Sequence, residues 1–315
     1  MVPDAEFTSY YGRPVVKAAP WEADIPAYLF LGGVAAGSSL LAAGATVTGR
    51  DGLRRSGRIA GLGAIGASFA ALVHDLGRPA RFVNMLRVAK VTSPMSVGTW
   101  ILTVYGPMAA LAGGSELTGL LPGALRAGVV GRLLRGAGTP AGVAAALTGP
   151  AVAAYTAVLL ADTATPSWHE AYRELPFVFV GSAAAASGGL GMLLAPLAES
   201  GPAQRLAVGG AALELLAERR MERSMGITAE PLHQGTAGRL MGAAKGLTGA
   251  GALLGLLAGR RSRAAAVASG LAMLGGSACI RFGVFEAGQA SARDPRYTLV
   301  PQRERLDRDG PTRST

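Results

Sequence analysis

Long runs without a charged residue constrain the fold of this chain more than any other feature. Four of them exceed the roughly 20 apolar residues that cross a bilayer as a helix, at 25–48, 91–115, 136–161 and 175–198. Shorter or interrupted runs lie at 59–74, 206–217, 240–259 and 264–285. Only 16% of the residues are charged, against about 25% in soluble domains. We therefore predict an all-α, polytopic membrane protein built as a bundle of about eight transmembrane helices.

These runs divide the chain into an N-terminal tail (1–24), an eight-helix transmembrane domain (25–286) and a charged C-terminal tail (287–315), which we expect to be extended. The first run follows acidic Glu22 and Asp24 with no basic segment before it, so we interpret it as a retained helix rather than a signal peptide. The net charge of +10 does not indicate a nucleic-acid partner, because the arginines lie in short loops between spans, next to membrane lipid.

An even number of crossings would place both termini on one side of the membrane, which we call face A. The loops 75–94, 162–174 and 218–236 would lie there too, and with them His74, His169 and His233. The opposite side, face B, would receive only short arginine-containing turns. We predict that docking or chemistry takes place at face A. Lysine and arginine are nearly balanced between the faces, but those of face B are packed into very short turns, which favours a cytoplasmic face B and termini outside.

The end of the second predicted helix carries polar residues that could do chemistry. His74 and Asp75 end this helix, and Gly77 can supply its C-terminal turn. An alternative is equally open: His74 and Asp75 would only mark the membrane interface, with Arg78 and its neighbours binding lipid phosphates.

A second candidate group surrounds the end of the fourth predicted helix. Tyr155 lies about 10 Å inside the membrane from Asp162 at the usual helical rise. Asp162, Trp168 and His169 would gather at face A, where they could exchange protons with a ligand that is reduced in the membrane. Trp168 taken alone is more typical of an interfacial anchor.

Glu214, Lys245 and Arg281 are charged residues inside predicted spans. Isolated charges are costly in a bilayer, so we expect a Glu–Arg or Glu–Lys pair within the bundle. The three residues would form either a proton path or a structural ion pair, and the sequence does not choose between them.

The single cysteine, Cys279, excludes a disulfide framework and a Cys-ligated iron–sulfur cluster within this chain. A haem is disfavoured because only His74 lies at the end of a span. We predict no metal site, no haem and no iron–sulfur cluster in this chain.

Three segments resemble the NrfD/PsrC family, the membrane subunits of polysulfide-reductase-type oxidoreductases. They are AYLFLGGVAAGSSL, DLGRPARFVNMLRVAKVTSPMSVGTWIL and YTAVLLADTATPSWHEAYRELPFVF, and the resemblance covers roughly residues 21 to 290. The family implies an eight-helix anchor without haem, docked to a four-cluster iron–sulfur subunit that serves a molybdopterin catalytic subunit. Such anchors exchange electrons and protons with a quinone pool.

Carried over by motif, Tyr155 matches the family's quinone-contacting tyrosine. Asp75 and Arg78 would lie at the same surface. Where some members have Asn and His at the start of helix one, this chain has Tyr28. We expect quinone contacts from Tyr28, His74, Arg78, Tyr155 and Trp168, and proton exchange through Tyr155, His74, Asp75, Asp162 and His169. Docking of the iron–sulfur subunit would use Arg81, Arg87 and Lys90.

The resemblance thus predicts a quinone-reactive subunit of an oxidoreductase complex, with the substrate chemistry in a partner. The high Gly, Ala and Arg content suggests a bacterial inner-membrane protein and menaquinone. The alternative is a polytopic transporter or a purely structural anchor, in which Glu214, Lys245 and Arg281 would form a permeation path. Transporters often have repeated halves with broken helices, and the sequence contains no such repeat.

Overall fold

The computed structural model describes residues 14–78 and 80–309, and the described residues form helices without a β-strand. The long helices are α1 (Asp24–Val47), α2 (Asp51–Asp75), α4 (Pro94–Glu116), α6 (Val129–Ala161), α8 (Leu175–Leu194), α9 (Gly201–Ser224), α10 (Gly235–Ala258) and α11 (Arg263–Arg293). The short α-helices are α3 (Ala80–Met85), α5 (Gly123–Ala127), α7 (Pro166–Glu170) and α12 (Arg296–Asp309). Short 3-10 helices are η2 (Thr118–Leu120), η3 (Leu197–Glu199) and η4 (Gly226–His233).

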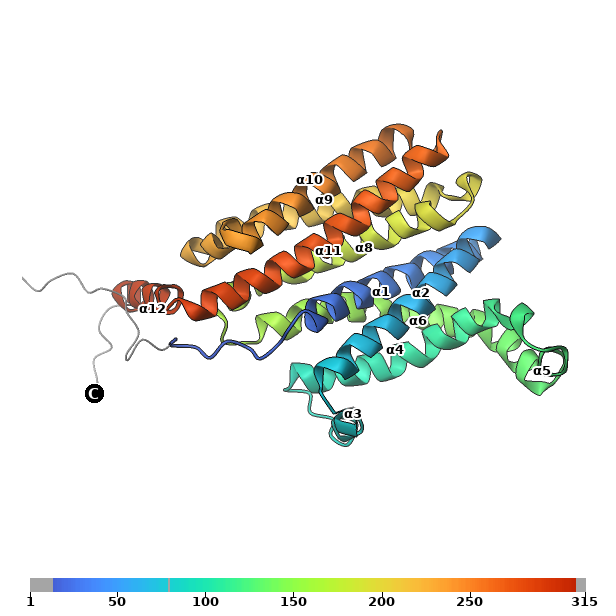
Figure 1. The fold of residues 1–315 in the computed structure, drawn as a ribbon, viewed down its shortest axis with the longest axis horizontal. Helices are drawn as coiled ribbons and strands as arrows, with labels where there is room; N and C mark the ends of the chain where they lie inside the picture. Colours follow the sequence, from blue (N-terminus) through green and yellow to red (C-terminus); the bar gives the residue numbers. More distant parts are fainter. Residues whose placement is uncertain (1–13, 79, 310–315) are drawn as a thin grey trace, which may run out of the picture.

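Seven of the described helices are long and apolar enough to cross a membrane, namely α1, α2, α4, α6, α8, α10 and α11. The remaining long helix, α9, carries glutamates and arginines in its second half and runs beside α8 and α10 (Figure 1). The predicted all-α polytopic membrane protein is confirmed. The predicted count of about eight membrane helices corresponds to seven apolar helices and one more polar helix, α9, which packs against α8 and α10.

The long helices form two groups that meet along α1 and α8. One group contains α1, α2, α4 and α6, and the other contains α8, α9, α10 and α11 (Figure 1). Small residues let the backbones approach closely: a Cβ on Gly188 of α8 would lie 2.4 Å from the Ala207 nitrogen of α9. Contact of this kind is how helices associate in lipid, where no hydrophobic effect drives them together.

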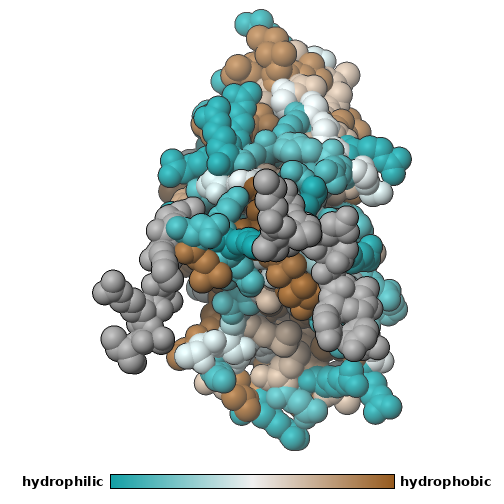
Figure 2. All heavy atoms as spheres, turned by 90° about the vertical axis from the view of Figure 1, so that its left-hand side faces the viewer, coloured by the Kyte–Doolittle hydropathy of each residue, from teal (hydrophilic) through white to brown (hydrophobic). Residues whose placement is uncertain are grey.

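The first and last described residues lie at the same end of the bundle, which is the predicted face A. Elements α3, α7 and η4 lie at this end as well, and α5 lies at the other (Figure 1). Hydrophilic side chains are spread over face A, with apolar ones between them (Figure 2).

Several helices are longer than the sequence predicted. Helix α2 begins at Asp51 rather than 59, α6 begins at Val129 rather than 136, and α9 continues to Ser224 rather than ending at 217. The reason is that a charged residue marks the edge of the hydrocarbon, whereas a helix can continue through the interface into water.

The prediction of an extended C-terminal tail is wrong for its described part. Helix α11 continues to Arg293, and α12 follows directly. Ion pairs hold α12 on face A: Arg296 lies 2.6 Å from Glu230, and Arg305 lies 3.2 Å from Glu170. These partners lie far away in sequence, so the charge pattern of the tail alone could not indicate them.

Candidate functional site

A groove opens between the start of α4 and the face A half of α6. Its polar end has a volume of about 420 Å³, and an apolar end of similar volume continues along the two helices. The polar end is lined by Val91, Thr92, Pro94, Val97, Ile101, Ala151, Tyr155, Val158 and Asp162. The apolar end shares Val91, Val97, Ile101 and Ala151 and adds Ala89, Lys90, Ser96, Trp100, Val104 and Thr148. We call the two ends together the α4–α6 groove.

Tyr155 forms part of the polar end and is 8% exposed. Its ring rests directly on Gly98 of α4, where a Cβ would lie only 1.7 Å from a ring carbon. Among the described residues, its hydroxyl has no hydrogen-bond partner. A buried phenol is normally hydrogen-bonded, so this hydroxyl is free to bond with a ligand in the groove. The structure thus brings Tyr155 and Asp162, two of the predicted site residues, into one cavity.

Hydrogen bonds fix the wall of the groove formed by the chain before α4. The Ser96 hydroxyl accepts from the Lys90 amide at 2.9 Å and donates to the Val88 carbonyl at 3.0 Å. The Trp100 indole N–H donates to the same carbonyl at 3.3 Å. Pro94 occupies the first turn of α4, where its missing N–H costs nothing. Sequence reasoning missed Gly98, Ser96 and Trp100 as supporting residues, although all three belong to the SPMSVGTW motif.

Tyr28 lies in the first turns of α1. It is 3% exposed and lines a different, apolar cavity of about 380 Å³ between α2 and α4. Phe82 and Leu86, from α3 and the residues just after it, contribute to that cavity. Tyr28 is therefore not part of the lining of the α4–α6 groove.

The predicted group at the end of α2 lies apart from the groove lining. The His74 imidazole pairs with the Asp24 carboxylate at 2.7 Å, which joins the end of α2 to the start of α1. Asp75 is half-buried beside this pair, and Arg78 is exposed. Gly77 has a φ of 65°, so the predicted left-handed turn that ends α2 is confirmed.

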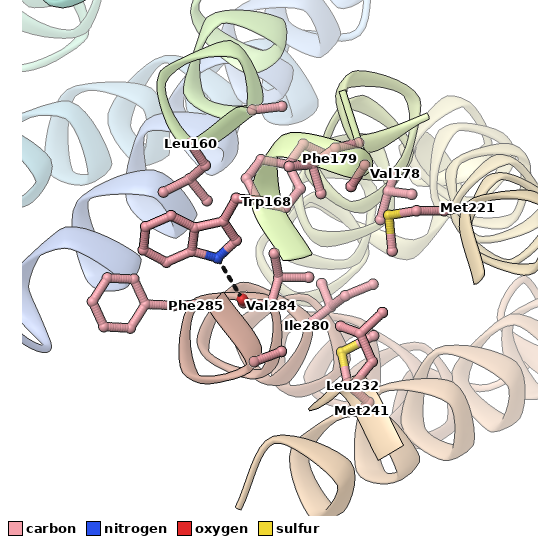
Figure 3. Packing of buried hydrophobic residues seen from close by; sticks show 14 of the residues in the cluster. Leu160, Trp168, Val178, Phe179, Met221, Leu232, Met241, Ile280, Val284 and Phe285 are labelled. Atoms are coloured by element: carbon pink, nitrogen blue, oxygen red, sulfur yellow. Dashed lines mark hydrogen bonds between the residues drawn. The ribbon is translucent and has the colours of Figure 1, made fainter. Parts of the chain in front are cut away.

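Trp168 belongs to the hydrophobic core near face A. It is 1% exposed, and its indole N–H donates to the Val284 carbonyl at 2.8 Å (Figure 3). Its ring lies 5.6 Å from that of Phe285 and 5.9 Å from that of Trp21, centroid to centroid. Trp168 is not among the groove residues. The next residue, His169, is exposed and contacts the Ala161 carbonyl through Nδ1 at 3.3 Å, which places it beside Asp162.

The three predicted docking residues are exposed. Arg81 lies in α3 and Arg87 follows that helix, and Arg81 donates to the Leu76 carbonyl at 3.1 Å. Lys90 also borders the apolar end of the groove. A basic surface on the α2–α4 loop therefore adjoins the groove.

The intramembrane charges lie in the other helical group, where Lys245 forms the expected Glu–Lys pair, but with glutamates other than Glu214. Lys245 approaches Glu222 at 2.8 Å and Glu218 at 3.7 Å rather than Glu214. Among the described residues, no acidic group lies within ion-pair distance of Arg281. Glu218 and Glu222 were not predicted from the sequence, because the predicted helix ended at residue 217. The available signal was the regular spacing of four residues from Glu214 to Glu218 and from Glu218 to Glu222.

Among the described residues, no group of three or more His, Cys, Asp and Glu side chains could hold a metal ion. Cys279 is a free thiol.

A comparison with known protein families shows which family the chain belongs to. Residues 15–215 match the family model described as polysulphide reductase, NrfD. The match includes every residue of the α4–α6 groove and stops within α9, earlier than the expected limit near 290. No curated protein matches the chain. Because the match covers nearly two thirds of the sequence, the chain belongs to the polysulphide reductase NrfD family.

Proposed function

We propose that this protein is the membrane anchor subunit of an oxidoreductase complex, and that it exchanges electrons and protons between a partner subunit and a quinone bound in the α4–α6 groove. The observation that carries the proposal is the Tyr155 hydroxyl, which lines the polar end of the groove and has no partner among the described residues. Membership of the NrfD family supports the anchor role.

The groove suits a molecule with a polar ring and a long apolar tail. Tyr155, Thr92 and Asp162 supply polar groups at the end nearest face A. The continuation past Trp100 and Val104 is apolar and runs along α4 and α6 away from face A. Its volume lies in the range typical of small-molecule sites. A bound quinone would take up or release electrons together with protons at its ring oxygens.

Each polar residue of the groove has a distinct proposed role. The Tyr155 hydroxyl would donate a hydrogen bond to a ring oxygen, and Gly98 beneath the ring would keep the hydroxyl in place. Asp162, exposed at the mouth, would pass protons to water together with neighbouring His169. His74 and Asp75 lie outside the lining and would act on the aqueous side.

The partner would dock on the basic surface formed by Arg81, Arg87 and Lys90. All three side chains are exposed and Lys90 borders the groove, so an acidic surface of an iron–sulfur protein could bind there. We propose that this partner carries four clusters and serves a molybdopterin catalytic subunit. We also propose a bacterial inner membrane as the location and menaquinone as the quinone.

Replacing Tyr155 by Phe tests the proposal, because it removes the donor and almost preserves the volume over Gly98. In the purified complex, quinone-linked turnover should fall by about 10²-fold, the usual effect of losing a positioned donor or acid. Activity of the catalytic subunit with an artificial electron acceptor should stay at the wild-type level. Unchanged quinone turnover would remove Tyr155 from the site, and equal loss of both activities would indicate misassembly.

A further inference from the structure

The chain between α4 and the body of α6 forms a hairpin at face B that the quinone site does not use. It consists of η2, α5 and the first two turns of α6, and we call it the α5–α6 hairpin (118–135). Helix α6 contains 33 residues and is therefore about 50 Å long, whereas the hydrocarbon core of a bilayer is about 30 Å thick. Its last residue, Ala161, lies at face A, so its first turns reach beyond the hydrocarbon on face B (Figure 1).

Backbone contacts fold α5 tightly onto the start of α6. The Arg135 guanidinium donates to the Arg126 carbonyl at 3.0 Å. Gly131 lies against the same carbonyl, where a Cβ would approach the oxygen to 2.1 Å, so a larger residue does not fit. The turn therefore brings Arg126, Arg132 and Arg135 close together.

These three arginines have no acidic counterpart. All three are exposed, and the sequence contains no Asp or Glu between Glu116 and Asp162. Glu116 already pairs with two cations of α2, Arg54 at 3.0 Å and Arg58 at 2.9 Å. In the part of the chain that the structure describes, no carboxylate lies within ion-pair distance of the three arginines. The α5–α6 hairpin therefore carries three uncompensated positive charges.

Large apolar side chains are exposed among these arginines. Leu120 is 81% exposed, Val129 is 61% exposed and Leu133 is 66% exposed. An exposed apolar patch of this kind marks a surface that another molecule or a membrane covers. The combination of arginines with exposed leucine and valine is typical of segments that lie in the membrane interface.

The exposed side of α6 continues from the hairpin into the membrane. Val143 is 44% exposed and Leu147 is 78% exposed. Leu133 and Leu147 are 14 residues apart, which is about four helical turns, so they lie on the same side of α6 and about 21 Å apart. One leaflet accounts for about half of the 30 Å hydrocarbon core, so this apolar stripe is long enough for the acyl chain of a lipid.

We propose that the α5–α6 hairpin binds an anionic phospholipid of the face B leaflet. The lipid phosphate contacts Arg126 and Arg132, since guanidinium groups bind phosphate oxygens in pairs. One acyl chain lies along the stripe from Leu133 to Leu147. A head group with a net negative charge is favoured because the three arginines attract it, whereas a zwitterionic head group adds a positive charge of its own. A soluble protein fits less well, because the stripe continues into the hydrocarbon.

Photo-cross-linking of the purified full chain tests the proposal. The protein is placed in phosphatidylcholine nanodiscs that contain a trace of phosphatidylglycerol with a diazirine on its acyl chain, and labelled residues are located by peptide mass spectrometry. Labelling within residues 129–147 should exceed that by the same probe with a phosphatidylcholine head group at least about fivefold. Unlabelled phosphatidylglycerol in excess should suppress this labelling, and unlabelled phosphatidylcholine should not.

Arg126→Gln combined with Arg132→Gln should remove the preference for the anionic probe. This variant keeps the bond that joins α5 to α6, because Arg135 donates to the backbone carbonyl of residue 126. Arg219→Gln combined with Arg239→Gln is the matched control, since both arginines are exposed and lie on α9 and α10 outside the hairpin. It removes the same charge and should keep the preference.

Equal labelling of wild-type protein by the two probes would overturn the proposal, and this comparison needs no variant. A preference that persists in the Arg126 and Arg132 variant, or that disappears in the control as well, would also overturn it. So would a protein that cross-links to the hairpin in the isolated complex in place of lipid. No quinone turnover is measured, so these results are separate from the test at Tyr155.

Discussion

At the scale of single residues, the α4–α6 groove depends on a contact between one aromatic ring and one glycine. Tyr155 can reach the groove because Gly98 leaves room for its ring. The loop before α4 adds a fixed wall through the hydrogen bonds of Ser96 and Trp100. The Tyr155 side chain, which we expect to contact the quinone, is carried by α6 and packs against α4. Its position is therefore sensitive to a single methyl group added at Gly98.

Gly98→Ala should displace the Tyr155 ring, since the new Cβ would overlap three ring and hydroxyl atoms at 1.7 to 2.1 Å. A displacement of this size typically lowers turnover by about 10²-fold, and we expect that loss for quinone-linked activity with dye-linked activity retained. Gly106→Ala is the control, because a Cβ at Gly106 of the same helix meets nothing within 4 Å. If the two variants turn over quinone equally well, the contact with Gly98 does not position the site.

At the scale of helices, glycine and alanine determine how closely α8 and α9 pack. A Cβ on Gly210 would lie 2.4 Å from the Ala185 backbone nitrogen, which cannot move aside as a side chain could. The close approach keeps α9, with its row of glutamates, covered by α8 and α10. A helix as polar as α9 can be part of the membrane domain because its neighbours, and not lipid, surround the carboxylates.

Gly210→Ala should therefore lower the melting temperature of the detergent-solubilised protein, because overpacking a tight contact usually costs about 1 to 3 kcal/mol. Gly209→Ala provides a matched comparison, since the neighbouring position has nothing within 4 Å of a Cβ. That variant should be unchanged or slightly more stable, as alanine favours the helix more than glycine does. Thermal unfolding of both variants decides the point, and similar melting temperatures would show that α8 and α9 are not held by this contact.

At the scale of the whole molecule, the two ends of the bundle differ in what they carry. Face A holds the mouth of the α4–α6 groove, the basic α2–α4 loop and helix α12. Face B holds the arginine-containing turns and α5. The groove and the proposed docking surface therefore face the same aqueous compartment.

We expect face A to be outside the cytoplasm, because the arginines of face B crowd into short turns that favour the cytoplasmic side. Fusion of a reporter after Thr315 measures this directly. Alkaline phosphatase should be active and a fluorescent protein dark, and a reporter joined before Met1 should give the same result. A bright fluorescent fusion would reverse the orientation and move the partner to the cytoplasm, while the sharing of one face by both termini would remain.

The sequence by itself determined the helical class, the membrane location and the family, because uncharged length and local motifs are properties of the chain alone. It also indicated Tyr155 and Asp162. Tyr155 lies on α6 and Asp162 directly follows that helix, seven residues later. This is about two helical turns, so both side chains lie on the same side of α6 and can line one groove. It misjudged where helices end, because charge marks the hydrocarbon boundary and not the end of helical hydrogen bonding.

Only the tertiary structure decided the contacts between helices. Trp168 looks like an interfacial anchor or a quinone contact in the sequence, but its ring is covered by Trp21 and Phe285 from distant parts of the chain. Gly98 becomes meaningful only when α6 places Tyr155 on it. Which charges pair depends on the rotation and depth of neighbouring helices: Lys245 reaches Glu222 and not Glu214, because its long side chain extends toward face A.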